Sequence, residues 1–263
     1  MNPGDDFLMV DVDRYLARIG LSERPSIDLE GLTLLQRAHL ATVPFENLDV
    51  VAGIEVRTDV AWSPDKVVEK RRGGWCFELN GAFGALLRAL GFDVLQLGAA
   101  VLLGGPNKVI DHLALEVGLD RSYLVDVGFG ESNVAPLDLN VRGPQFDPAG
   151  TFEFIDSSQG MTLTWHDAEG VPVPQYRFRR IHHELSEFNE ASTRLRTDPT
   201  LSWRNKPFAT RLIDASVDGS ADRLTLKRNR TTLKSDGNET DTPVAPADWA
   251  ETLAELFDME SPL

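Results

Sequence analysis

The 263-residue chain is predicted to be an α+β protein, with helices first, strands in the middle and a mixed C-terminal part. Three observations predict this class. Apolar residues recur at helical spacing through the first 90 residues, and from about Val94 they alternate with polar residues. A hairpin and a helix then close the chain. Runs of one element type followed by the other are typical of α+β proteins, and this length fits one large domain or up to three small ones.

The helical part contains three expected helices. The third is the clearest, because Leu79, Phe83, Leu86, Leu87 and Leu90 form one apolar stripe and Gly91 follows as a stop signal. Gly20 ends the first helix in the same way. The expected bounds are Asp11–Ile19, Leu32–Thr42 and Cys76–Leu90.

The middle part contains short strands separated by Gly, Pro, Asn and Asp, a density that favours an antiparallel sheet or a small barrel. The expected strands are Val94–Leu103, Lys108–Leu119, Ser122–Phe129, Phe152–Ile155, Met161–Trp165 and Tyr176–Ile181. A polar, loop-rich stretch is expected after Leu185. A hairpin over Arg223–Lys227 and Thr231–Lys234 and a helix over Pro246–Phe257 complete the chain.

Composition excludes several classes of protein. The 41 acidic and 26 basic residues give a formal net charge of −15, which argues against nucleic acid or an anionic membrane as the main partner. No run approaches the roughly 18 apolar residues of a membrane span, and the acidic N-terminus lacks the positive region of a signal peptide. The single cysteine permits neither an intramolecular disulfide nor a multi-cysteine metal site, so we expect a reducing, cytoplasmic location and no metal.

Cys76 is either an apolar filler or a reactive thiol. It follows Gly73-Gly74-Trp75 and occupies the first turn of an expected helix. The positive end of a helix dipole stabilises a thiolate, which is the form in which cysteine acts as a nucleophile. The two glycines would let backbone approach a ligand closely.

Strand parity selects a base among the five histidines. Leu113, Leu115 and Val117 form the apolar face of one strand, and alternate apolar residues of the next strand form the other half of that face. With these faces aligned across a short turn near 118–121, His112 and Asp126 share the opposite face. This register requires an odd number of loop residues, or a bulge. The pair would be close enough for a carboxylate–imidazole hydrogen bond. The other interpretation is a chance polar pair on a solvated face.

These segments match a known family. The segments RRGGWCFELNGAF (71–83), DHLALEV (111–117) and YLVDVGFG (123–130) together resemble the arylamine N-acetyltransferases. PFENLD (44–49) and YLARIG (15–20) resemble the N-terminal region of the same family. The matches stand in the family's chain order and span about residues 10–140.

The resemblance implies a catalytic triad with Cys76 as nucleophile, His112 as base and Asp126 as the residue that orients the base. It also implies an N-terminal helical bundle over 1–92, a central antiparallel β-barrel over 93–190 and a C-terminal α/β lid over 191–263, in agreement with the periodicity. The core would be similar to that of transglutaminases and papain-like cysteine-triad enzymes. The chain's oligomeric state is left open.

The implied reaction transfers an acetyl group from acetyl-CoA, a co-substrate, to an arylamine, arylhydrazine or arylhydroxylamine by a ping-pong mechanism. By resemblance, Phe45, Val101 and Phe129 line the acceptor cleft. Gly128 and Gly130 would let backbone approach CoA.

Two residues depart from the family's pattern. Asp111 stands where the family often has Thr or Ser and would modestly repel the phosphates of CoA, and Glu131 follows Gly130 where a further glycine is common. A chain of net charge −15 must also gather positive charge or backbone N–H groups around CoA, and the sequence does not locate them.

Three other functions stay open. The first is an amide synthase of the same superfamily, which would take an acyl chain from a carrier protein to an aromatic amine and close a macrolactam. The second is a cysteine amidohydrolase, which would admit water to the acyl-enzyme. The third is a non-catalytic binding protein in which Cys76 is buried and unreactive.

Overall fold

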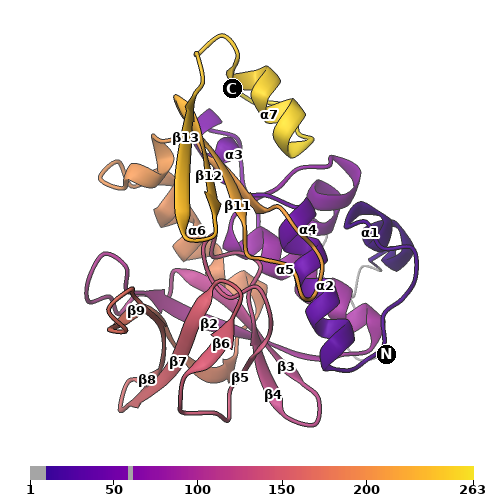
Figure 1. The fold of residues 1–263 in the computed structure, drawn as a ribbon, viewed down its shortest axis with the longest axis vertical. Helices are drawn as coiled ribbons and strands as arrows, with labels where there is room; N and C mark the ends of the chain where they lie inside the picture. Colours follow the sequence, from indigo (N-terminus) through magenta and orange to yellow (C-terminus); the bar gives the residue numbers. More distant parts are fainter. Residues whose placement is uncertain (1–9, 59–61) are drawn as a thin grey trace.

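The computed structural model describes residues 10–58 and 62–263. Helices from the N-terminal part pack beside an eight-stranded sheet, and a five-stranded sheet with the C-terminal helix lies above that sheet in Figure 1. This is the expected α+β order of helical bundle, barrel and C-terminal α/β unit. The acidic N-terminal segment on which the signal-peptide expectation depends lies largely outside the described residues. No helix in the described part of the chain is long and apolar enough to cross a membrane.

The helices are fixed by local signals at their ends. Asp28 accepts a hydrogen bond from the Gly31 N–H at the start of α2, and Gly91 ends α5 with a left-handed backbone at φ 102°. The helices are α1 (Val12–Arg18), α2 (Leu29–Thr42), α3 (Leu48–Ala52), α4 (Trp62–Pro64), the π-helix η1 (Asp65–Glu69), α5 (Cys76–Leu90), the 3₁₀-helix η2 (Leu185–Phe188), α6 (Asn189–Thr197), the 3₁₀-helix η3 (Ser202–Arg204) and α7 (Trp249–Phe257).

The strands fall into two sheets. The five-stranded sheet has the order β1-β10-β11-β12-β13, and the eight-stranded sheet has the order β5-β4-β3-β2-β9-β8-β7-β6. The strands are β1 (Phe45–Glu46), β2 (Asp93–Val101), β3 (His112–Gly118), β4 (Ser122–Val125), β5 (Leu137–Asp138), β6 (Gln145–Asp147), β7 (Gly150–Ser157), β8 (Gly160–His166), β9 (Pro172–His182), β10 (Ala209–Leu212), β11 (Arg223–Lys227), β12 (Arg230–Ser235) and β13 (Asn238–Pro243).

The eight-stranded sheet is a nearly closed antiparallel barrel, as the sequence predicts. Its terminal strands β5 and β6 are joined by a side chain: the backbone N–H of Asp138 donates to Gln145 Oε1 at 2.8 Å, and Gln145 Nε2 donates back to the Asp138 carbonyl at 3.0 Å. The barrel interior is filled by alternate residues of its strands. Among them are Leu97, Leu124, Phe154, Leu163 and Phe178, all buried.

Helix α5 connects the helical part to the barrel. Its apolar stripe, which includes Leu79, Phe83 and Leu86, shares one buried cluster with α1, α2 and the outer face of β3 and β4. Because α5 packs on β3, its first turn comes close to the end of β4. The sequence predicts this helix with the same bounds, Cys76–Leu90.

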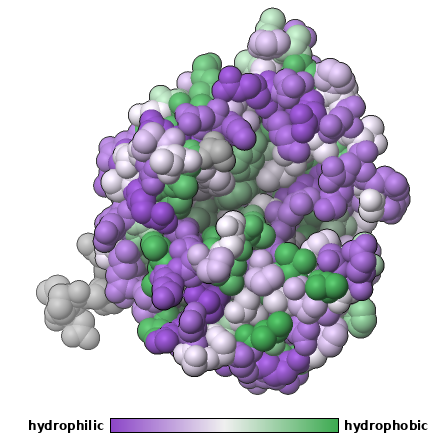
Figure 2. Space-filling model, turned by 90° about the vertical axis from the view of Figure 1, so that its left-hand side faces the viewer, coloured by the Kyte–Doolittle hydropathy of each residue, from purple (hydrophilic) through white to green (hydrophobic). Residues whose placement is uncertain are grey.

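The five-stranded sheet combines distant parts of the chain. Its edge strand β1 comes from the N-terminal part and pairs Phe45 with Thr210 of β10, while the opposite edge, β13, is fully exposed. One face of the sheet packs on α7 through Leu226, Leu253 and neighbouring apolar residues. Figure 2 shows the surface hollowed between this upper part and the barrel below. The division at 93 and 191 stays a prediction.

Several expected elements differ in extent. The strand expected over Lys108–Leu119 begins only at His112, because residues 104–111 form a loop whose Asp111 carboxylate accepts from Val101 N and Asn107 Nδ2. The strand expected to reach Phe129 ends at Val125, where the chain leaves the sheet. The stretch expected to be loop after Leu185 contains α6, a mostly polar helix.

Candidate active site

Cys76 is the first residue of α5 and is 7% exposed. The two glycines before it are required by close packing within the chain. A Cβ atom on Gly73 would lie 2.1 Å from the Pro44 carbonyl oxygen, and one on Gly74 would lie 2.5 Å from Glu78 Oε2. The segment that contains the glycines is also hydrogen-bonded to β1, because Glu46 N donates to the Gly74 carbonyl at 2.9 Å. At Gly73 and Gly74, the backbone therefore approaches other parts of the protein closely.

His112 and Asp126 form a buried pair. His112 Nε2 donates to Asp126 Oδ2 at 2.7 Å, and the two side chains are 2% and 0% exposed. Burial lowers the pKa of His112, but the charge of Asp126 and hydrogen bonds to Asp126 and Cys76 outweigh burial and raise it to about 10. Since Asp126 occupies Nε2, Nδ1 is the ring nitrogen left to serve Cys76. The hydrogen-bonded pair and Cys76 therefore lie together in one site.

The parity argument for this pair is confirmed, with a shift in register. Strands β3 and β4 are joined by an odd-numbered loop over 119–121, as the argument requires. They pair Leu115 with Val125, so the register does not place Asp126 opposite His112. Asp126 instead lies one residue beyond the end of β4, and its side chain reaches His112 from there.

Asn80 holds the second carboxylate oxygen of Asp126. Its Nδ2 donates to Asp126 Oδ1 at 2.8 Å and to the Leu113 carbonyl at 2.6 Å, and its Oδ1 accepts from Val127 N at 3.0 Å. Asn80 follows Cys76 by one helical turn, so both side chains leave the same face of α5. The sequence shows that spacing, but it assigns no role to Asn80.

Gly128 lies against the nucleophile. Its N–H donates to Asp126 Oδ1 at 2.8 Å, and a Cβ atom there would lie 2.6 Å from Cys76 Cα and 2.8 Å from Asn80 Nδ2. Only glycine leaves room for Cys76 at this point. Its expected contact with CoA stays a prediction.

Aromatic rings surround the imidazole of His112. The rings of Phe129 and Tyr176 lie 5.1 and 4.9 Å from it, centroid to centroid, and 4.9 Å from each other. Burial and then the negative charge of Asp126 raise the pKa of Tyr176 well above its usual range. Tyr176 therefore stays a neutral phenol. In the register of β2 and β9, Tyr176 stands opposite Val101.

Phe45 belongs to a second aromatic group at the other end of the site. Its ring lies 5.6 Å from the rings of both Trp203 and Phe208, and Trp203 stacks on Trp75 at 6.1 Å. Trp203 and Phe208 come from a stretch in which the sequence predicts no site residue. Gly130, with φ 86°, approaches the Phe45 ring, where a Cβ atom would lie 3.2 Å from Cδ1.

A cavity of about 900 Å³ begins at Phe45 and Gly130 and continues over the five-stranded sheet. Its lining carries the positive charge that the sequence does not locate. The basic residues that line it are Lys206, Lys227, Arg228, Arg230 and Lys234, against the acidic residues Glu131 and Glu239. Alternation along β11 and β12 brings three of these side chains to one face of the sheet, because residues two apart in a strand share a face.

Asp111 lies away from this cavity lining. Its carboxylate accepts hydrogen bonds within the loop before β3, and Arg194 of α6 lies 3.4 Å from its Oδ2. Its expected effect on CoA stays a prediction.

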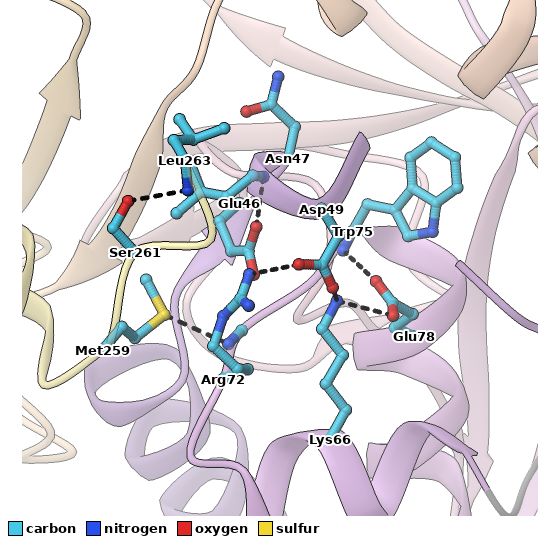
Figure 3. Close-up of polar contacts among 12 residues, drawn as sticks. Glu46, Asn47, Asp49, Lys66, Arg72, Trp75, Glu78, Met259, Ser261 and Leu263 are labelled. Atoms are coloured by element: carbon cyan, nitrogen blue, oxygen red, sulfur yellow. Dashed lines mark hydrogen bonds and ion pairs between the residues drawn. The ribbon is translucent and has the colours of Figure 1, made fainter. Parts of the chain in front are cut away.

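A buried ion-pair network lies near the start of α5 and is drawn in Figure 3. Lys66 Nζ lies 2.7 Å from Asp49 Oδ2 and 2.9 Å from Glu78 Oε1, and Arg72 lies 2.8 Å from Glu46 Oε1 and 2.9 Å from Asp49 Oδ1. Burial lowers the pKa of Lys66, but the surrounding carboxylates outweigh burial and raise it.

The network is anchored at the start of α5. Trp75 N donates to Glu78 Oε2 at 3.2 Å, which completes a cap at the N-terminus of the helix next to Cys76. Glu78 therefore joins the ion pairs to the turn that carries the thiol. No cluster of His, Cys, Asp and Glu suited to a metal ion occurs within residues 10–58 and 62–263.

The geometry can be compared with known proteins. A family model described as N-acetyltransferase matches residues 28–262. The chain belongs to this N-acetyltransferase family. Solved family members share the fold: an arylamine N-acetyltransferase from Salmonella typhimurium has a TM-score of 0.86 at 27% identity, covering 94% of this chain and 90% of the other. One from Mycobacterium marinum, solved in complex with CoA, has a TM-score of 0.84 at 27% identity, covering 95% of this chain and 93% of the other.

Curated family members are more similar over shorter segments. The pineal gland isozyme of arylamine N-acetyltransferase from Gallus gallus is 39% identical over 176 residues, which cover 64% of this chain and 58% of that protein. Arylamine N-acetyltransferase from Escherichia coli is 33% identical over 181 residues, covering 67% and 64%. The chain thus matches somewhat under two thirds of the length of these two relatives.

Proposed function

We propose that the protein transfers an acetyl group from acetyl-CoA to an arylamine, arylhydrazine or arylhydroxylamine through an acetyl-Cys76 intermediate. The observation that carries the proposal is the buried His112–Asp126 pair together with Cys76. A cavity with a basic lining, which begins at Phe45 and Gly130, supports it. The names of the relatives in two comparisons, and the CoA in the M. marinum complex, support the same reaction class.

In the first half-reaction, Cys76 acts as a thiolate. Because the pKa of His112 is about 10, the imidazolium form persists at neutral pH and stabilises that thiolate. The sulfur of Cys76 attacks the thioester carbonyl carbon, and the carbon–sulfur bond to CoA breaks. His112 gives its proton to the departing sulfur, so CoA leaves as a thiol and Cys76 carries the acetyl group.

In the second half-reaction, His112 acts as a base. The neutral nitrogen of the acceptor attacks the acetyl carbon, His112 Nδ1 takes the proton that this nitrogen loses, and the bond from carbon to Cys76 Sγ breaks. Weakly basic aromatic amines suit this step because they are unprotonated at pH 7. Phe129 beside His112 is an apolar surface for their rings. Phe45, with Trp203 and Phe208, is a second such surface and would exclude water from the thioester.

The basic cavity is where we place the phosphates of CoA. Lys227 and Arg228 line it without an ion pair to another described residue, whereas Lys234 pairs with Glu131 at 3.1 Å. The expected contacts of Gly128 and Gly130 with CoA and the acceptor contact of Val101 belong to this proposal. We also propose a cytoplasmic location, because a single thiol that must remain reduced suits that compartment.

Mass spectrometry of the intact protein tests the proposal. Mixing with acetyl-CoA should add the mass of one acetyl group, located on the peptide that contains Cys76, and an arylhydrazine should remove it with formation of acetylated product. Cys76→Ala should acquire no mass. Loss of the acetyl group at the same rate without an acceptor would favour an amidohydrolase-like enzyme, and no mass gain with an intact thiol would overturn the proposed reaction.

A further inference from the structure

A second cavity, of about 390 Å³, lies between the barrel and the five-stranded sheet. It adjoins the larger cavity, because Glu131 and Lys234 line both. Its remaining lining is different in character. Phe152 and Trp165 of the barrel and Val134 of the segment before β5 line it together with Arg223 of the sheet. A volume of this size is typical of small-molecule sites.

Arg223 is the unusual member of this lining. It is only 5% exposed, in the middle strand β11, where its register partners are Leu212 and Lys234. Its guanidinium makes no hydrogen bond or ion pair with any residue in 10–58 or 62–263, although it lines the cavity. Buried guanidinium groups are ordinarily paired, because an isolated buried charge is costly.

The acidic residues around the cavity do not supply that partner. Glu131 is ion-paired with Lys234 at 3.1 Å, Asp222 accepts a hydrogen bond from the hydroxyl of Ser235 at 2.6 Å, and Asp236 is exposed in a turn. Burial lowers the pKa of Arg223 to about 10, while Glu131 raises it, so the side chain is a cation at neutral pH. The cavity therefore contains a fixed positive charge next to apolar walls.

We propose that this cavity is a binding site for a small aromatic carboxylate, separate from the acetyl-transfer site, with Arg223 as its anchor. A carboxylate suits Arg223 as a partner, because a planar guanidinium can donate two parallel hydrogen bonds to its two oxygens. The planar body of the ligand lies against Phe152 and Trp165, which are neighbours across β7 and β8. Gly150 makes room for the indole, since a Cβ atom there would lie 2.5 Å from Trp165 Nε1.

The two cavities lie at different positions along β11, which provides a control. Arg223 and Lys227 project from the same face of β11, four residues apart, but Arg223 lines the smaller cavity and Lys227 the larger one. Removing the charge of Arg223 therefore changes the smaller cavity, and removing the charge of Lys227 changes the larger one. Ala221 also lines the smaller cavity, so Ala221→Leu fills it without changing a charge.

Calorimetric titration of the full chain with benzoate tests the proposal. We expect one benzoate per chain, at least tenfold weaker binding of neutral benzamide, and weaker binding of inorganic phosphate, which lacks the apolar body. Arg223→Met and Ala221→Leu should each weaken benzoate binding at least tenfold, and Lys227→Gln should leave it unchanged. Saturating CoA should not displace benzoate.

The readout is independent of acetyl transfer, so failure of the proposed function does not affect it. No benzoate binding to the wild-type chain, equal binding of benzamide, or tighter binding of phosphate would overturn the assignment. So would benzoate affinity that survives in Arg223→Met or is lost in Lys227→Gln. If Arg223→Met does not fold, benzoate binding to Ala221→Leu and the comparison of benzoate with benzamide test the same proposal.

Discussion

The amide of Asn80 lies 2.8 Å from Oδ1 of Asp126, so one side chain joins the helix that carries Cys76 to the end of the strand that carries the carboxylate. The other oxygen of Asp126 lies 2.7 Å from His112 Nε2. The orientation of the imidazole therefore depends on a residue whose hydrogen bonds go to Asp126 and to backbone atoms, and not to the ring.

Asn80→Ala should lower the rate of acetylation of Cys76 by about 10- to 100-fold, because Asp126 loses a buried donor that fixes its position. The buried acceptors left without a partner should also destabilise the fold by about 1–3 kcal/mol. The rate is measured by rapid mixing with acetyl-CoA and mass spectrometry. Asn140→Ala, at an exposed amide, is the control, and an unchanged rate in Asn80→Ala would contradict the role given to Asn80.

Gly128→Ala should abolish most of the activity. The added methyl group would overlap Cys76 Cα at 2.6 Å, so either α5 or the segment after β4 must move, and overpacking of this kind costs about 1–3 kcal/mol. Gly143→Ala is the matched control, since a Cβ atom there meets nothing within 4 Å. Activity and thermal unfolding are compared for both variants. Equal activity of the two would show that Gly128 does not position Cys76.

The pH dependence of the reaction of Cys76 with iodoacetamide should differ between the wild-type protein and Asp126→Asn. A His112 pKa of about 10 keeps the imidazolium in place at neutral pH, and the imidazolium stabilises the thiolate. Asp126→Asn removes the charge that raises this pKa and leaves the burial that lowers it, so the pKa should fall to the ordinary value of about 6.5 or below. The alkylation rate of the variant should then rise with pH, whereas identical profiles for the two proteins would contradict the assignment.

Lys66→Met should destabilise the protein by about 3–5 kcal/mol, because it leaves the buried carboxylate of Glu78 without a cation and that of Asp49 with Arg72 alone. Lys70→Met is the matched control. Lys70 pairs with Asp65 at the surface, where such a pair contributes at most about 1 kcal/mol. Urea unfolding measures both changes. Similar values for the two variants would mean that the buried network contributes little.

Lys227→Gln should raise the KM for acetyl-CoA about three- to tenfold and leave kcat nearly unchanged, since it removes charge from the proposed phosphate site and not from the triad. The effect should shrink at high salt, which screens charges at an exposed cavity. Steady-state kinetics at two ionic strengths measure both. A fall in kcat with constant KM would place Lys227 elsewhere in the reaction.

The helix over Cys76–Leu90 and the strand over Arg223–Lys227 were predictable with the bounds they have in the structure. Helix α6 was not, because Asn189–Thr197 is mostly polar and contributes little to a core. Strand β1 has two residues and exists only because Phe45 pairs with Thr210, far along the chain. A strand of that length has no pattern of its own in the sequence.

By itself, the sequence determined the local periods, the order of helices and strands, and the shared face of His112 and Asp126, because each depends on spacings within a few residues or on one hairpin. Only the tertiary structure decided that Asn80 and Gly128 hold the triad and that Lys66 balances two buried carboxylates. It also decided that cations from the segment before β10 and from the β11–β12 hairpin line one cavity. Those relations join residues far apart in the chain, and the packing of α5 on β3 and of the C-terminal sheet over the barrel brings them together.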